Sequence, residues 1–198
     1  MNSKITLSLF KEALYCLDSE LSGVQNLPVI IRAVGGFALL YHEIRLSGYT
    51  VDIDSVTEDF PQEVMKCIEK IANKFDFPTD WLNNYNVLDN DVEAIEMMID
   101  PDWIQIYPDL QNIEIYVADL NTLLRSKLLA SDSVQESGRL QDFPDLVTIF
   151  RKLGCFTLDS IILHCNSLDL DLKVMYPFVL QQLKNLFISR KNKPLLPL

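Results

Sequence analysis

Apolar and polar positions repeat with two different periods along this chain, and each period predicts a different kind of element. Near the start the apolar positions recur at helical spacing, at Leu7, Phe10, Leu14, Leu17 and Leu21. This period predicts an amphipathic helix that ends near Gly23. Residues 29–34 (VIIRAV) are short, β-branched and mostly apolar, which predicts a buried strand. Residues 51–56 (VDIDSV) alternate apolar and polar, which is typical of a strand with two different faces.

The later pattern turns from strands to helices. A helix is expected after Asp59 and Pro61, an irregular segment over 75–86 and a short helix over 91–99. Two strands, 103–107 and 113–117, are joined by a turn at Pro108-Asp109. From residue 119 the pattern is helical, over 119–131, 139–153, 157–166 and 172–190. The sequence therefore predicts an α+β fold, with a mixed sheet flanked by helices in residues 1–118 and a helical part, 119–198, packed on that core.

Composition narrows the class of protein. The hydrophobic fraction of 48% predicts a packed core, and the formal net charge of −11 excludes a general nucleic-acid coat protein, because phosphates would be repelled. That charge is compatible with a local nucleotide pocket, with docking of an RNA end or with a basic partner protein. Four scattered cysteines, no signal peptide and no apolar run near ~20 residues predict a soluble, cytoplasmic protein with no membrane contact.

Two acidic residues carry the main chemical hypothesis. Asp52 and Asp54 are two apart in the expected strand, so both carboxylates lie on one face. Like charges at that separation need neutralisation, which Mg²⁺ (or Mn²⁺) provides by binding one or two carboxylates together with substrate phosphates. The alternative is an exposed strand that carries two acids for solubility alone.

Two glycines precede these aspartates. Gly35 and Gly36 stand between the buried strand and the expected helix, where glycine permits a sharp turn and a close approach of the backbone to a ligand. The free amides of a helix start attract phosphate. The alternative is a tight turn or a close packing contact. Together the glycine turn and the aspartates predict phosphoryl or nucleotidyl transfer.

The segment AVGGFALLYHEIRLSGYTVDID resembles the signature of the nucleotidyltransferase superfamily, which has the DNA polymerase beta-like fold. It is most similar to a minimal bacterial branch that includes abortive-infection toxins. In that branch a T-x-D-[IL]-D motif, here Thr50 to Asp54, is followed by a lysine and by a helix with arginine and aspartate. The equivalent residues are Lys127, Arg139, Asp142 and Asp145. Gly48 stands where the family commonly has an arginine, and Arg45 is the nearest substitute.

The resemblance implies roles for these residues. Asp52 and Asp54 would bind metal and act in catalysis with Glu114 and Lys127, and Glu114, Asp142 or Asp145 would complete the carboxylate set. Nucleotide would be bound by Gly35, Gly36, Arg45, Thr50, Arg139 and Asp142. An exposed strand glutamate and a surface lysine are the alternatives for Glu114 and Lys127. Trp81 lines a substrate pocket with Asn83 and Asn84 or is a core residue.

The resulting hypothesis is a magnesium-dependent nucleotidyltransferase that moves a nucleotidyl group from an NTP to a hydroxyl acceptor. The resemblance implies a tRNA end or a protein as the acceptor, and a cognate antitoxin as partner if the chain is a toxin. A second hypothesis is a catalytically inactive nucleotide-binding or protein-interaction module with the same fold. A third is a helical interaction protein with an accidental pair of aspartates, which would have no sheet between residues 29 and 117.

Overall fold

A computed structural model describes residues 4–24, 27–45, 47–56, 60–84, 102–132, 142–190 and 193–196. The chain divides into two compact units, Met1–Asp119 (unit 1) and Leu120–Leu198 (unit 2), and each is described by itself. In the described residues unit 1 holds a five-stranded mixed sheet with helices, and unit 2 holds helices. The predicted α+β class is confirmed, and the helical fold of the third hypothesis is wrong.

The first helix, α1 (Leu7–Glu20), forms as the apolar period predicts. The hydroxyl of Thr6 accepts a hydrogen bond from the amide of Leu9, which satisfies one of the amides left free at a helix start. The apolar stripe is buried, with Phe10 and Leu14 fully inaccessible. The chain leaves the helix through Gly23, whose φ of 77° belongs to the left-handed region that favours glycine.

The sheet of unit 1 has the order β3-β2-β1-β5-β4. Its strands are β1 (Val29–Val34), β2 (Ile53–Ser55), β3 (Leu82–Asn83), β4 (Trp103–Ile106) and β5 (Ile113–Ala118). The central strand β1 pairs parallel with β5 and antiparallel with β2. At the two edges, β3 runs parallel to β2 and β4 antiparallel to β5.

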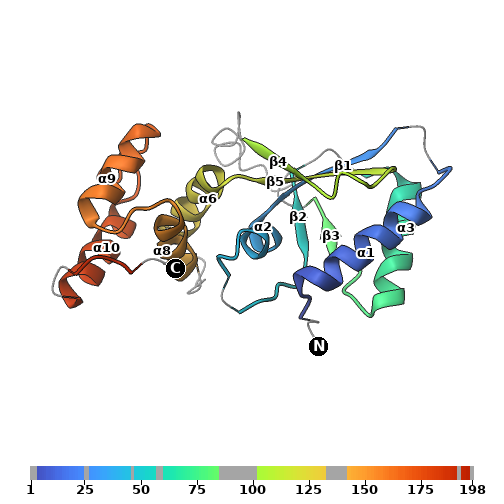
Figure 1. The fold of residues 1–198 in the computed structure, drawn as a ribbon, viewed down its shortest axis with the longest axis horizontal. Coiled ribbons are helices and arrows are strands. Elements are labelled where there is room, and N and C mark those ends of the chain that lie inside the picture. Colours follow the sequence, from blue (N-terminus) through green and yellow to red (C-terminus); the bar gives the residue numbers. More distant parts are fainter. Residues whose placement is uncertain are drawn as a thin grey trace. The chain divides into compact units, whose positions relative to one another are not determined.

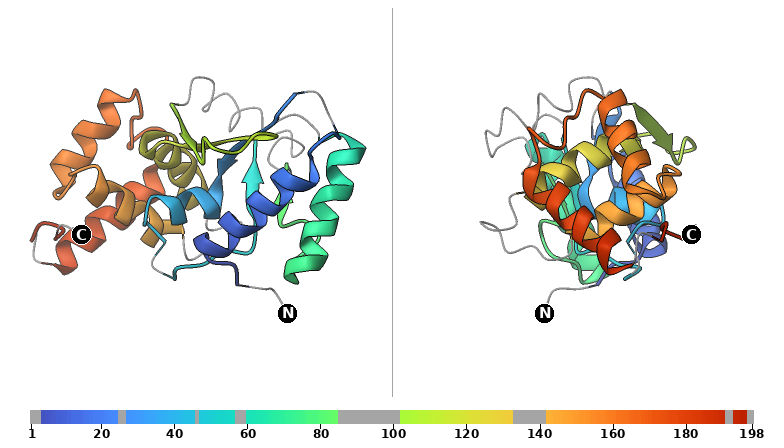
Figure 2. Two further views of the ribbon diagram at one scale, coloured as in Figure 1. Left: turned by 45° about the vertical axis from the view of Figure 1, so that its right-hand side comes forward. Right: turned by 90° about the vertical axis from the view of Figure 1, so that its left-hand side faces the viewer.

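One face of this sheet is the core of unit 1. Ile31 and Val117 are fully buried on that face, whereas Arg32 of β1 is exposed on the other. Helices α1, α2 (Gly35–Tyr41) and α3 (Gln62–Phe75) all lie on the same side of the sheet in Figures 1 and 2. Phe10 of α1 and Phe37 of α2 meet edge to face, with ring centroids 5.4 Å apart.

Two details of unit 1 differ from the sequence prediction. The strand expected over 51–56 is limited to Ile53–Ser55, so Asp52 lies just outside it. The backbone of Thr50 pairs with Ile5, while Ile53 donates to the carbonyl of Trp81, and the chain bends between these two pairings. The segment expected to be irregular contains the short strand β3. The predicted helix 91–99 and the predicted Asp59 cap lie outside the described residues.

Unit 2 contains four described helices close to the predicted ranges. They are α6 (Leu120–Asp132), α8 (Asp142–Lys152), α9 (Leu158–Ser167) and α10 (Pro177–Ser189). Thr157 and Ser160 form a reciprocal capping box at the start of α9. None of the described helices is long and apolar enough to cross a membrane.

Candidate functional site

Asp54 lies on β2 between two neighbours that contact its two carboxylate oxygens. A Cβ added to Gly35 would come within 2.3 Å of Asp54 Oδ2, so this oxygen lies directly against the backbone at the start of α2. On the other side, Asn83 Nδ2 lies 3.5 Å from Asp54 Oδ1. Gly35 has a φ of 59°, so it is required both for its backbone conformation and for the space that Asp54 fills.

Gly36 is required for a different reason. Its φ is not in the left-handed region, but an added Cβ would lie 2.2 Å from Thr50 Oγ1 and 2.8 Å from Arg45 Nη1. The guanidinium of Arg45 in turn donates from Nη1 to Thr50 Oγ1 over 3.4 Å. The structure therefore brings Gly35, Gly36, Arg45, Thr50 and Asp54 together at the start of α2. The glycine pair accommodates these side chains, in addition to any ligand that its amides bind.

Asp52 is half-buried and its environment is strongly negative. Burial, followed by the charges of Asp54 and Asp80, raises its pKa from 3.8 to about 6, while Arg45 and a hydrogen bond from Thr50 oppose the increase. The group is therefore mainly ionised at neutral pH, but at an electrostatic cost that a bound cation would remove. The repulsion among these carboxylates, which Arg45 and Thr50 offset only in part, fits the chemistry of a divalent cation, which takes carboxylate oxygens and substrate phosphates. Among the described residues no group of three or more His, Cys, Asp or Glu side chains is arranged to hold a metal by itself.

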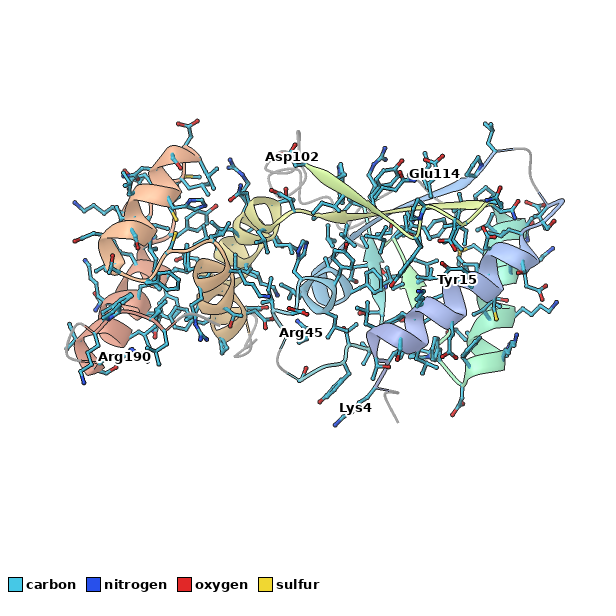
Figure 3. The ribbon with its side chains drawn as sticks, in the orientation of Figure 1. Lys4, Tyr15, Arg45, Asp102, Glu114 and Arg190 are labelled. Atoms are coloured by element: carbon cyan, nitrogen blue, oxygen red, sulfur yellow. The ribbon has the colours of Figure 1, made fainter. Side chains whose placement is uncertain are left out.

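Glu114 is not brought to the aspartates. It pairs with Ile30 across β5 and β1, whereas Asp54 pairs with Val34 across β2 and β1. The two acidic residues share a face of the sheet but are offset by four residues, or about 13 Å along β1, and by two strand spacings. Figure 3 shows the labelled Glu114 and Arg45 well apart. The Glu114 carboxylate instead accepts a hydrogen bond from the Tyr116 hydroxyl, 2.9 Å away, which raises the pKa of Tyr116.

Trp81 is a core residue and not part of a pocket. It is fully buried, its ring packs among Phe10 and Phe77, and its Nε1 donates to the carbonyl of Ile68 over 3.1 Å. The alternative interpretation of this tryptophan as a core residue is confirmed. Its position fixes the loop that leads into β3.

Three charged residues of unit 2, Lys127, Asp142 and Asp145, form a buried cluster. Lys127 Nζ lies 2.5 Å from Asp142 Oδ1 and 3.8 Å from Asp145 Oδ2, so α6 and α8 are joined by ion pairs. Lys127 and Asp142 are 8% and 1% exposed, which excludes a snorkelling surface lysine. Within the part of the chain that the structure describes, Asp142 Oδ2 has no hydrogen-bond partner. Arg139, the fourth residue that the family resemblance assigns to this part of the chain, lies outside the described residues.

The roles of two residues at this site were not predicted from the sequence, where Asn83 was named only as a possible pocket neighbour of Trp81 and Asp80 was not named. Asp80 contributes to the field at Asp52, and Asn83 contacts Asp54, yet both lie in a segment that was expected to be irregular. The signal available was the polar run at Asn83 and Asn84. That run did not indicate which aspartate Asn83 would meet, because the contact depends on the pairing of β3 with β2.

Charge is distributed unevenly between the two units. Residues 1–119 contain 21 Asp and Glu against 7 Lys and Arg, a formal charge of −14, and residues 120–198 contain 7 against 10, a formal charge of +3. The net charge of −11 is the sum of these two values. The candidate site around Asp52 therefore lies in the strongly acidic unit, where Arg32 and Arg45 are the two arginines.

Comparisons with protein-family models, with curated proteins and with solved structures found no match to this chain.

Proposed function

We propose that this protein is a magnesium-dependent nucleotidyltransferase that moves a nucleotidyl group from an NTP to a hydroxyl acceptor. The observation that carries the proposal is that Asp54, Arg45 and Thr50 lie against the Gly35-Gly36 turn at the start of α2. Asp52 interacts with the same three side chains. The motif resemblance in the sequence supports the same class of reaction.

Each side chain has a distinct task in this proposal. Asp52 and Asp54 would hold Mg²⁺, and the bound ion would supply neutralisation of the phosphate charge. The amides at Gly35 and Gly36 and the guanidinium of Arg45 bind the phosphates of the NTP. Thr50 holds Arg45 and Asp52 in place through its hydroxyl.

Unit 2 supplies the remaining residues of the proposal. The roles that the resemblance implies, catalysis for Lys127 and nucleotide binding for Asp142, stay predictions. The two side chains form an ion pair with each other. The acceptor is proposed to be a tRNA end or a protein hydroxyl, with a cognate antitoxin as partner. The positive formal charge of residues 120–198 favours this unit over the acidic unit 1 for contact with an RNA backbone.

The test is a transfer assay with each of the four labelled NTPs, cellular RNA or protein, and Mg²⁺ or Mn²⁺. Asp52→Asn and Asp54→Asn keep the side-chain shape and remove the charge, and each is expected to abolish labelling. Glu69→Gln, an exposed site on α3, is the matched control and keeps full labelling. Labelling that persists in both aspartate variants contradicts the metal role.

A second candidate is a nucleotide-binding module without transfer activity. The remoteness of Glu114 favours it, because the site then has Asp52 and Asp54 without the third carboxylate that the resemblance implies. Calorimetry separates the two functions. Binding of NTP with Mg²⁺, and no transfer to any acceptor tested, would support the binding module.

A further inference from the structure

Asn83 is a buried polar residue at the edge of the candidate site. Its side chain is 6% exposed although the residue belongs to a strand of only two residues at the end of the sheet. It pairs with Asp54 in the parallel register of β2 and β3, so the two side chains project from the same face of the sheet. A buried amide has to be hydrogen-bonded, and its partners indicate its purpose.

The Asn83 side-chain nitrogen faces two acceptors. Nδ2 lies 3.5 Å from Asp54 Oδ1 and 3.2 Å from the carbonyl oxygen of Asp80. An amide group has two N–H donors on nitrogen and only acceptor sites on oxygen. The NH₂ end must therefore face Asp54, because the reverse orientation would set a carbonyl oxygen against a carboxylate. The carbonyl of Asp80 fixes this orientation before any ligand binds.

Asp54 is restrained from the opposite side as well. Its Oδ2 occupies the space that a Cβ at Gly35 would fill, and its Oδ1 faces Asn83. The three residues come from the start of α2, from β2 and from β3, so the carboxylate is held across three neighbouring elements.

We propose that Asn83 is a positioning residue that orients the Asp54 carboxylate against the start of α2, in the geometry that binds the metal. Asn83 itself does not contact the metal or the nucleotide. This inference rests on the proposed function, since it gives Asp54 the metal that the function requires. Residues that orient a metal ligand typically change metal affinity by 10–100-fold when they are replaced.

The experiment measures Mn²⁺ affinity in the full chain. Asn83→Ala and Asn83→Leu remove the donor, and each is expected to weaken Mn²⁺ binding by about 10–100-fold. Leu82→Ala is the matched control, because Leu82 is the other residue of β3, is 1% exposed and projects to the opposite face. Leu82→Ala is expected to lower the urea midpoint of unfolding. Its Mn²⁺ affinity should stay within about twofold of wild type, which we count as unchanged because Leu82 does not contact the ligand.

Several outcomes overturn the proposal. Unchanged Mn²⁺ affinity in both Asn83 variants would do so, and so would an equal loss in Leu82→Ala, which would mean that β3 acts only through stability. Crystal structures of the wild type and of Asn83→Ala test the same idea without metal, and an Asp54 carboxylate that keeps its orientation in the variant refutes it. If wild type binds no Mn²⁺ but Asp54 turns away in Asn83→Ala, the proposed function fails and the positioning role stands.

Discussion

Replacing Lys127 by methionine should destabilise unit 2 strongly. Methionine has nearly the length of the lysine stem, so the packing of the aliphatic part is retained and the change removes the ammonium group. Asp142 and Asp145 are 1% and 7% exposed, and they would then remain as buried carboxylates without the cation that faces them.

The size of the effect follows from this burial. Removing one partner of a buried ion pair typically costs about 3–5 kcal/mol, because the remaining charge is not compensated. Domains of this size are stable by about 5–15 kcal/mol, so the loss is a large share of the total. A double variant, Lys127→Met with Asp142→Asn, removes the closer charge as well and should recover at least about 1 kcal/mol of the loss.

The assay is urea denaturation followed with two probes. Trp81 and Trp103 are the two tryptophans of the chain and both belong to unit 1, so tryptophan fluorescence follows that unit. Far-UV circular dichroism follows the helices of both units, and the Lys127→Met transition should shift in this signal. A loss below about 1 kcal/mol, within the range of exposed pairs, would refute the conclusion that the lysine is committed to a buried ion pair.

Three further outcomes are expected. Gly35→Ala combines a left-handed φ of 59° with an overlap at Asp54 Oδ2, so it should lower the free energy of unfolding by about 1–3 kcal/mol and abolish Mn²⁺ binding in a calorimetric titration. Gly23→Ala is the control, because Gly23 has a φ of 77° but open space around the added Cβ, and this variant should still bind Mn²⁺ in the same titration. Because the Asp52 pKa is raised to about 6 in the folded protein, ionisation of this group lowers stability as pH rises from 4 to 6. Asp52→Asn should therefore be more stable than wild type above pH 6, by about 1 kcal/mol after solvent screening, and equal to it below pH 4 in urea titrations. Trp81→Phe loses a buried hydrogen bond to Ile68 and part of its ring volume. It should lower the free energy of unfolding by about 2 kcal/mol, measured by urea denaturation with the fluorescence of Trp103 as the probe.

Periodicity predicted the strongly patterned elements of this fold. The stripe from Leu7 to Leu21 specified α1, and the apolar run VIIRAV specified β1, because burial of those side chains dominates the local free energy. The strand β3 could not be predicted in the same way. Its two residues form a strand only because β2 offers a free edge beside them.

Only part of the candidate site could be predicted, because the sequence pattern gives the face of a strand but not its register with a neighbour. Alternation along a strand tells which face a side chain occupies, and it placed Glu114 on the polar face. It does not tell how far one strand is displaced along its neighbour, and that displacement separates Glu114 from Asp54. The pairing of Asn83 with Asp54 is a register effect of the same kind.

The uneven charge of the two units has a consequence for how the chain meets other molecules. An isoelectric point near 4.5 describes the whole chain and neither unit, because residues 1–119 carry −14 and residues 120–198 carry +3. Partners of opposite sign are therefore expected to prefer different units, a basic protein unit 1 and a polyanion unit 2. Both attractions weaken with added salt, so the same chain should be retained at low ionic strength by anion-exchange resin through one unit and by heparin through the other.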